Sequence, residues 1–139
     1  MRAAKRGVAE PLVFFVDRSL GSRVVPEALR QAGEVVEIHD DHFPADARDA
    51  DWLSVVGSRG WIVLTKDERI RYRMIEQHVM MRASVAAFIL TAGGVTGAEM
   101  ARIFIRALPK IRRFVRTYRR PFIASVTRSS AVVLIRKRS

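Results

Sequence analysis

The sequence predicts an α/β fold with a mostly parallel central sheet. Short apolar runs rich in β-branched and aromatic residues alternate with longer helical segments along the chain. These runs lack polar alternation, which is typical of parallel strands buried on both faces. A length of 139 residues suits one domain with a real core and leaves no room for a second full domain. We therefore expect a single domain over residues 1–139, with residues 1–10 flexible.

The first half of the chain supplies three expected strands, at residues 12–16, 35–38 and 61–64. Residues 22–32 are expected to form the first helix, because Pro26 falls in its first turn and Gly33 follows its end. Residues 46–58 are expected to form the second helix, which ends between two glycines. The order of these segments gives two strand–helix–strand units, the building block of a parallel sheet.

The second half begins with an expected helix at residues 70–82 and a fourth strand at residues 85–90. Thr96 and Glu99 have the spacing of a capping box, which predicts a long helix starting near residue 97 and running toward residue 118. Pro109 is expected to break or kink that helix. Residues 122–126 and 131–135 then predict a hairpin at the sheet edge, so that residues 100–139 form a basic C-terminal helix and strands.

The positive charge is concentrated in that C-terminal part. The chain has 25 lysines and arginines against 14 acids, a formal net charge of +11. Residues 100–139 carry 12 of the basic residues and no acid, whereas residues 1–99 are nearly balanced. A field of this sign attracts polyanions, so nucleic acid or an acidic protein is the expected partner. Base composition of the coding DNA is the alternative explanation, since arginine outnumbers lysine 21 to 4.

Several classes of protein are excluded by composition. The chain has no cysteine, which rules out a disulfide scaffold, a thiolate zinc site and a cysteine nucleophile. No apolar run approaches the roughly 20 residues of a membrane-spanning helix. The basic residues near the N-terminus are not followed by the apolar segment of a secretory signal. We therefore expect a cytoplasmic protein without a membrane contact.

Acidic residues follow the expected strands at one edge of the sheet. Asp17 ends the first strand. The third strand ends in Thr65, Lys66 and Asp67. Ligand sites of such folds lie at the carboxyl ends of the strands. Asp49 adds a further acid, because it lies on the inward stripe of the second helix, in its first turn. Asp51 is about 200° around the helix from Asp49 and should face elsewhere.

Clustered carboxylates raise one another's pKa values, and a cation resolves the conflict. Oxygen ligands without histidine or cysteine favour Mg²⁺ or Mn²⁺, whose obvious chemistry is phosphodiester hydrolysis. Each acid also has a structural alternative. Asp17 and Asp67 have the position of turn or helix-capping residues, and Asp49 has capping-box spacing from Asp46. The Thr65 hydroxyl is placed to bond a carboxylate or a metal-bound water, or is simply a β-branched strand end.

Three stretches carry a resemblance to a known family: FFVDRSLGSRVVPEALRQAG, DARDADWLSVVGSRGWIVLTKDERIR and VAAFILTAGGVTGAEMARIF. Together they cover most of residues 14–104, and they resemble PIN-like domain proteins, most closely those assigned as VapC-type toxins. The shared pattern is a strand ending in Asp, a helix that begins with an acid before an apolar pair, and a strand ending in T-x-D. The resemblance implies a three-layer PIN-like fold.

The resemblance also implies a function. PIN domains are typically Mg²⁺- or Mn²⁺-dependent ribonucleases, and the toxins among them are neutralised by an antitoxin and often dimerise. By resemblance, Asp17, Asp49 and Asp67 are metal-binding catalytic acids with Thr65 beside them. The larger family usually has a further acid, for which Asp51 is the candidate here.

Arginines are the candidates for binding RNA or an antitoxin. One group follows Asp67 and the other lies on the long helix: Arg69, Arg71, Arg73, Arg112, Arg113 and Arg116. Two other functions compete with the nuclease. One is a non-catalytic PIN-like module that binds nucleic acid or protein. The other is a receiver-type phosphoacceptor, which is disfavoured because Thr65 and Lys66 are adjacent rather than on separate strands.

Overall fold

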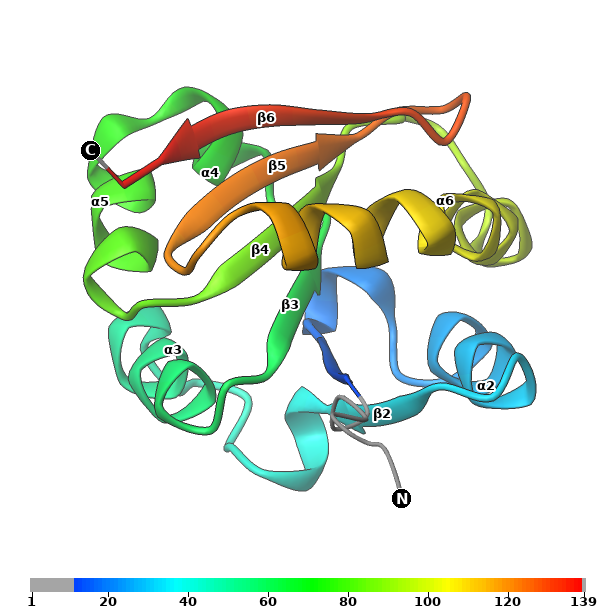
Figure 1. Ribbon diagram of the computed structural model, residues 1–139. Coiled ribbons are helices and arrows are strands. Elements are labelled where there is room, and N and C mark those ends of the chain that lie inside the picture. Colours follow the sequence, from blue (N-terminus) through cyan, green and yellow to red (C-terminus); the bar gives the residue numbers. More distant parts are fainter. Residues whose placement is uncertain (1–11, 139) are drawn as a thin grey trace, which may run out of the picture.

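The computed structural model describes residues 12–138, so the expected flexibility of residues 1–10 falls outside the described part. Over these residues the chain forms one six-stranded sheet in the order β2-β1-β3-β4-β5-β6 (Figure 1). The strands are β1 (Val13–Val16), β2 (Val35–Ile38), β3 (Ile62–Thr65), β4 (Ala86–Leu90), β5 (Phe122–Val126) and β6 (Val132–Lys137). Each neighbouring pair from β2 to β5 is parallel, and β6 pairs antiparallel with β5. The mostly parallel α/β sheet and its C-terminal hairpin are confirmed.

Two layers of helices cover the sheet. One core packs α2 (Val24–Gln31) and α6 (Gly97–Thr117) against side chains such as Phe14 and Phe88. The other packs α3 (Asp49–Ser58), α4 (Glu68–Tyr72) and α5 (Met74–Arg82) against the opposite face, around Phe15 and Val63. Because Phe14 and Phe15 are consecutive in β1, they point to opposite faces, and both are fully buried. The predicted three-layer arrangement is therefore confirmed.

Pro109 does not break the long helix, so the expected break is wrong, whereas the first and the later turns of α6 run in different directions, as the expected kink requires (Figure 1). α6 continues through Pro109 from its capping box at Thr96 and Glu99 to residue 117. Pro109 lies on the exposed face of α6, while Ala107 and Ile111 are buried on the other. The lost backbone bond therefore faces water, and the continuous apolar face holds the helix together on both sides of the proline.

The region after β3 also differs from the prediction, because the single helix expected at residues 70–82 is two. α4 begins at Glu68, capped by the Asp67 side chain, and ends where Arg73 adopts an extended conformation. α5 then starts at Met74. The side-chain cap starts the first of these helices two residues earlier than hydrophobic periodicity indicates.

α3 begins later than predicted and approaches α5 closely. Arg48 is its N-cap residue, in an extended conformation, so the alternative capping box between Asp46 and Asp49 does not form. At Gly57, α3 meets the end of α5, where an added Cβ would overlap the Ala83 carbonyl oxygen. Within residues 12–138, no helix has both the length and the apolar character needed to span a bilayer.

Candidate active site

The ends of β1 and β3 bring Asp17, Thr65 and Asp67 to one edge of the sheet. β1 and β3 are neighbours in parallel register, and the Asp17 amide continues the ladder by donating to the Leu64 carbonyl at 3.0 Å. Parallel strands end at the same edge, so residues that follow them are brought together. Strand pairing, rather than loop geometry, sets the position of these side chains.

A pair of hydroxyl groups fixes one oxygen of the Asp17 carboxylate. Thr65 Oγ1 donates to Asp17 Oδ2 at 2.8 Å, and Ser19 Oγ donates to the same oxygen at 2.7 Å. In turn, Thr65 Oγ1 accepts the Asp67 amide at 3.1 Å, and Ser19 Oγ accepts the Lys66 amide at 2.9 Å. The network ties the end of β1 to the loop after β3. Among the described residues, Asp17 Oδ1 accepts no hydrogen bond and is available to a cation.

Ser19 is part of this site and was not among the predicted residues. It lies in a short 3-10 helix, Arg18–Leu20, which Asp17 caps through the Ser19 amide. The structural alternative for Asp17, a capping role, is therefore correct as well. A serine two residues after an acid is the spacing of such a cap, and this was the signal available in the sequence.

Asp49 is held by an indole. It is the first residue of α3, and Trp52 Nε1, one helical turn on, donates to Asp49 Oδ1 at 3.0 Å. Trp52 is buried against Phe15, so the donor is fixed. Asp51 lies elsewhere, as its helical angle predicts: it pairs with Arg48 at 3.1 Å at the surface, with its side chain 62% exposed.

Arg69 joins two of the acids. Its Nη2 lies 2.7 Å from Asp67 Oδ2 and 3.4 Å from Asp49 Oδ2, and its Nε donates to Asp67 Oδ1 at 3.0 Å. The hydrogen bond from the Arg69 side chain holds the Asp67 pKa below its ordinary value of 3.8, against the opposing effect of partial burial. The predicted contact of Arg69 with RNA or a partner stays a prediction, and in this structure its guanidinium pairs with two carboxylates.

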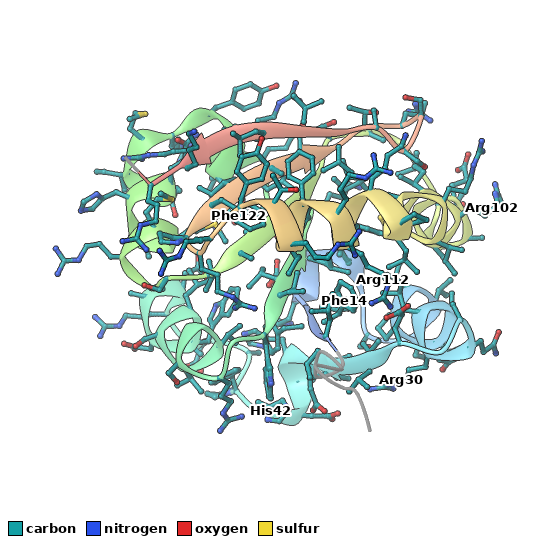
Figure 2. The ribbon with its side chains drawn as sticks, viewed as in Figure 1. Phe14, Arg30, His42, Arg102, Arg112 and Phe122 are labelled. Atoms are coloured by element: carbon teal, nitrogen blue, oxygen red, sulfur yellow. The ribbon has the colours of Figure 1, made fainter. Side chains whose placement is uncertain are left out.

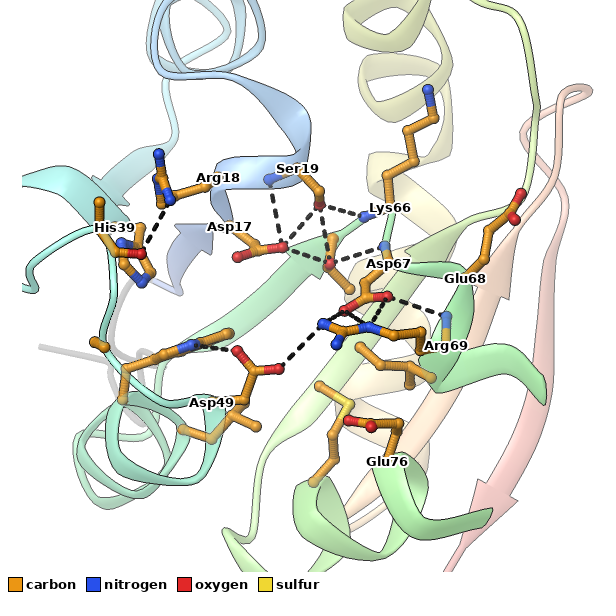
Figure 3. Close-up of a pocket in the computed structure, with 17 residues that line it drawn as sticks. Asp17, Arg18, Ser19, His39, Asp49, Lys66, Asp67, Glu68, Arg69 and Glu76 are labelled. Atoms are coloured by element: carbon orange, nitrogen blue, oxygen red, sulfur yellow. Dashed lines mark hydrogen bonds and ion pairs between the residues drawn. The ribbon is translucent and has the colours of Figure 1, made fainter. Parts of the chain in front are cut away.

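Apart from Asp51 and its partner Arg48, the side chains of this site line one cavity of about 480 Å³ (Figure 3). In the figure, the Arg69 guanidinium lies between the carboxylates of Asp49 and Asp67. Glu68 and Glu76, which the sequence prediction had not selected, line the same cavity. In this arrangement, with Arg69 paired to Asp49 and Asp67, no three histidine, cysteine, aspartate or glutamate side chains within residues 12–138 lie close enough together to hold a metal ion.

The other predicted arginines lie outside this cavity. Arg71 stacks over the exposed Tyr72 ring, with its Cζ 4.9 Å from the ring centroid, and Arg73 forms the break between α4 and α5. Arg112 is paired with Glu34, close to the start of β2 (Figure 2). α6 runs from the carboxyl edge of the sheet back to its amino edge, so Arg113 and Arg116 lie toward the edge away from the acids.

Residues 12–92, more than half of the chain, match the family described as "PIN like domain". This chain belongs to the PIN-like domain family. It is also 30% identical over 123 residues to "Putative ribonuclease VapC45" of Mycobacterium tuberculosis (strain H37Rv), an alignment that covers 86% of this chain and 88% of the relative. No solved structure matches the chain significantly. The predicted family is confirmed. The matched residues include every residue that lines the cavity of Figure 3, which we call the acidic cavity.

The hydroxyl network of this PIN-like domain predicts a stability effect. Thr65→Val keeps the side-chain shape but removes a buried hydroxyl that serves Asp17 and the Asp67 amide. The Asp67 amide would lose its acceptor and Asp17 Oδ2 would keep only its bonds from Ser19, which should lower the free energy of unfolding by about 1–3 kcal/mol. Urea denaturation of the two proteins measures this difference. A Thr65→Ser variant, which retains the hydroxyl, is the matched control and should lose less.

The hydrogen bonds between Arg69 and Asp67 predict that the stability of the folded chain depends on pH. The pKa of Asp67 is lowered in the folded chain. The ionised Asp67 carboxylate therefore stabilises the fold at a pH above its ordinary pKa of 3.8, and this stabilisation disappears as the pH falls through the lowered pKa. In metal-free buffer, the stability difference between the wild type and Asp67→Asn should therefore shrink between about pH 5 and about pH 2. Urea unfolding across this range tests it, and a constant difference would contradict the assignment.

Proposed function

We propose that this chain is a divalent-metal-dependent endoribonuclease and the toxin of a toxin–antitoxin pair. One observation carries the proposal: Asp17, Asp49 and Asp67, from three separate segments of a PIN-like domain, line a single cavity at the carboxyl edge of the sheet. The name of the mycobacterial relative, a ribonuclease, supports the same reaction class. The reaction is hydrolysis of RNA phosphodiester bonds by one domain that comprises residues 1–139.

The donor chemistry of the cavity fits Mg²⁺ or Mn²⁺. Its ligating groups are carboxylate and hydroxyl oxygens, which these hard cations prefer. We propose Asp17, Asp49 and Asp67 as the residues that hold the metal, with Asp17 Oδ1 an oxygen that accepts no hydrogen bond within residues 12–138. A bound metal activates water and stabilises negative charge on the phosphate. Asp51 could join the metal ligands only if its ion pair with Arg48 opened.

The chain's own residues have separable tasks in this proposal. Thr65 and Ser19 orient the Asp17 carboxylate by donating to Oδ2, which leaves Oδ1 free of these bonds. Trp52 fixes one oxygen of Asp49 in the same way. Arg69 must release Asp49, and at least part of Asp67, before both acids turn to a cation. Its guanidinium then becomes available for a phosphate at the rim of the cavity.

Partners follow from the same proposal. Arg71 and Arg73 adjoin the residues that line the cavity and are proposed to contact RNA, while Arg113 and Arg116 lie toward the other edge and are proposed to contact a protein. That protein is a cognate antitoxin, and a second copy of this chain is a further proposed partner. The site of action is the cytoplasm.

An RNA cleavage assay tests the proposed activity. The purified chain, incubated with end-labelled RNA, should produce internal fragments with Mg²⁺ or Mn²⁺ and none with EDTA. Cleavage that persists in EDTA would contradict metal dependence. RNA binding without cleavage in either metal would instead support the non-catalytic PIN-like module.

The toxin role needs its own experiment. Induced expression of the wild-type chain should arrest bacterial growth, and expression of Asp17→Asn should not. Co-expression of a small gene that neighbours this one should restore growth and yield a stable complex with the chain. Growth that continues when active nuclease accumulates would rule out the toxin role without affecting the proposed nuclease activity.

A further inference from the structure

A second cavity, of about 270 Å³, lies where α6 begins and the turn between β5 and β6 approaches it. Three exposed arginines line it: Arg102 and Arg106, one turn apart on α6, and Arg128 from the turn. Within residues 12–138, none of the three forms an ion pair with an acid. These arginines, which we call the edge cluster, are thus not committed to an intramolecular salt bridge.

The edge cluster is built on a fixed part of the fold. Arg128 Nη2 donates to the Gly93 carbonyl at 2.7 Å, which ties the turn to the loop after β4. Ser130, which is buried at the end of the same turn, donates to the Ile103 carbonyl of α6 at 2.9 Å. Because the turn is attached to both α6 and the loop, the three guanidinium groups share a defined site.

One carboxylate lines this cavity, and it is already engaged. Glu99 accepts the Thr96 amide at 2.8 Å as part of the α6 capping box. That backbone bond is the main reason why the Glu99 pKa is lowered. Glu99 cancels at most one of the three positive charges of the edge cluster, so the cavity stays positive.

The edge cluster and the acidic cavity lie on the same edge of the sheet. Arg128 follows β5, and Asp67 follows β3, with the end of β4 between them. The ends of β3 and β5 are thus two strand spacings apart, about 10 Å. Lys66, also at the end of β3, points away from the acids in Figure 3. Figure 2 shows Arg102 projecting outward near the start of α6, whereas Arg112 lies farther along the helix.

We infer that Arg102, Arg106 and Arg128 bind backbone phosphates of the RNA strand next to the segment that enters the acidic cavity. This inference rests on the proposed function. The five carboxylates that line the acidic cavity outnumber its three cations, Arg18, Lys66 and Arg69, so further cations beside the cavity add affinity for RNA. The edge cluster provides three such cations around one concavity at the same edge of the sheet, on the side that α6 covers, whereas residues of α3, α4 and α5 line the acidic cavity on the other side. Guanidinium groups also match phosphate in geometry.

The position of the edge cluster supplies a matched control. Arg116 lies 14 residues beyond Arg102 on α6, or about 21 Å along the helix axis. Arg120, just after the helix, bonds the Gly60 and Trp61 carbonyls before β3, which places this end of α6 at the amino edge. Arg113, Arg116 and Arg119 are exposed there. Replacing all three with glutamine removes as much charge as replacing the edge cluster.

The experiment measures binding without cleavage. A short fluorescently labelled single-stranded RNA is titrated, in EDTA and at several salt concentrations, with three proteins: wild type, the edge-cluster triple variant (each arginine to Gln) and the control triple variant. Each phosphate contact on a single strand contributes about 0.7 to the salt slope, so losing three should lower the slope by about 2. At about 0.1 M salt this corresponds to roughly 100-fold weaker binding. The control should bind like the wild type.

Each outcome decides the inference. Equal weakening in both triple variants would show that only net charge matters, and an unchanged affinity of the edge-cluster variant would show that RNA does not bind there. An edge cluster that instead binds an acidic protein would give this second result. Because Arg128 also bonds Gly93, the Arg102→Gln/Arg106→Gln double variant is a second test, expected to lose about 20-fold. Since binding is measured without metal, failure of the proposed nuclease activity is a separate result.

Discussion

Asp17→Asn should reduce the rate of metal-dependent RNA cleavage by more than about 100-fold while leaving the fold intact. Asparagine keeps the shape of aspartate and an oxygen that accepts from Thr65 and Ser19, but it removes the charge that a metal requires. Changes to residues that only orient metal ligands cost about 10–100-fold, so losing a proposed ligand should cost more. Single-turnover cleavage of labelled RNA at saturating enzyme measures the effect.

The same variant gives a readout that does not depend on cleavage. Mg²⁺ or Mn²⁺ that binds only the folded chain raises its melting temperature, and Asp17→Asn should abolish most of that gain. Asp51→Asn is the matched control, because Asp51 is an acid of the same domain that faces solvent and pairs with Arg48. If Asp17→Asn and Asp51→Asn keep equal cleavage and equal thermal response to metal, Asp17 is not a ligand.

Gly57→Ala should be strongly destabilising, costing about 3 kcal/mol. The added Cβ would overlap the Ala83 carbonyl oxygen and approach Val85 Cγ1 to 3.3 Å. The first obstacle is backbone at the end of α5, which cannot rotate aside as a flexible side chain can. The gain in helix propensity from glycine to alanine, about 1 kcal/mol, is too small to offset the clash.

Thermal unfolding tests this prediction, with an expected fall in melting temperature of about 10 °C. Ser54→Ala, at an exposed position of the same helix, is the control and should change stability by less than about 0.5 kcal/mol. A Gly57→Ala protein as stable as the control would mean that α3 and α5 separate at little cost. Cleavage activity in that case would report whether Asp49, at the other end of α3, moves with the helix.

The strands and the three acids could be predicted from sequence because the signals are local. An apolar run such as residues 62–65 is buried on both faces wherever it is placed in the sheet, and the residue that follows it lies at the carboxyl edge. Asp49 could be placed from helical periodicity alone. These inferences require only that the strands are parallel and end at the same edge, not their exact order in the sheet.

What could not be predicted depends on contacts between distant segments. Ser19 joins the site because β1 and β3 are neighbours, which brings its hydroxyl to the Lys66 amide 47 positions along the chain. Arg69 contacts Asp49 only after α4 and α3 are packed on the same face. The expected break at Pro109 was wrong for the opposite reason, since the local rule for proline gives no weight to an apolar face that extends on both sides of it.

The hydrogen bond between Trp52 and Asp49 makes the fluorescence of Trp52 sensitive to binding in the acidic cavity. The sequence contains two tryptophans, and Trp52 has its indole nitrogen on a cavity carboxylate while its ring packs on Phe15. Indole emission responds to the charge and polarity around the ring, so any cation that draws Asp49 away from Trp52 Nε1 changes the colour or intensity of its fluorescence. With Trp61→Phe removing the other source, occupancy of the acidic cavity could be followed in real time, without a label and without any RNA being cut.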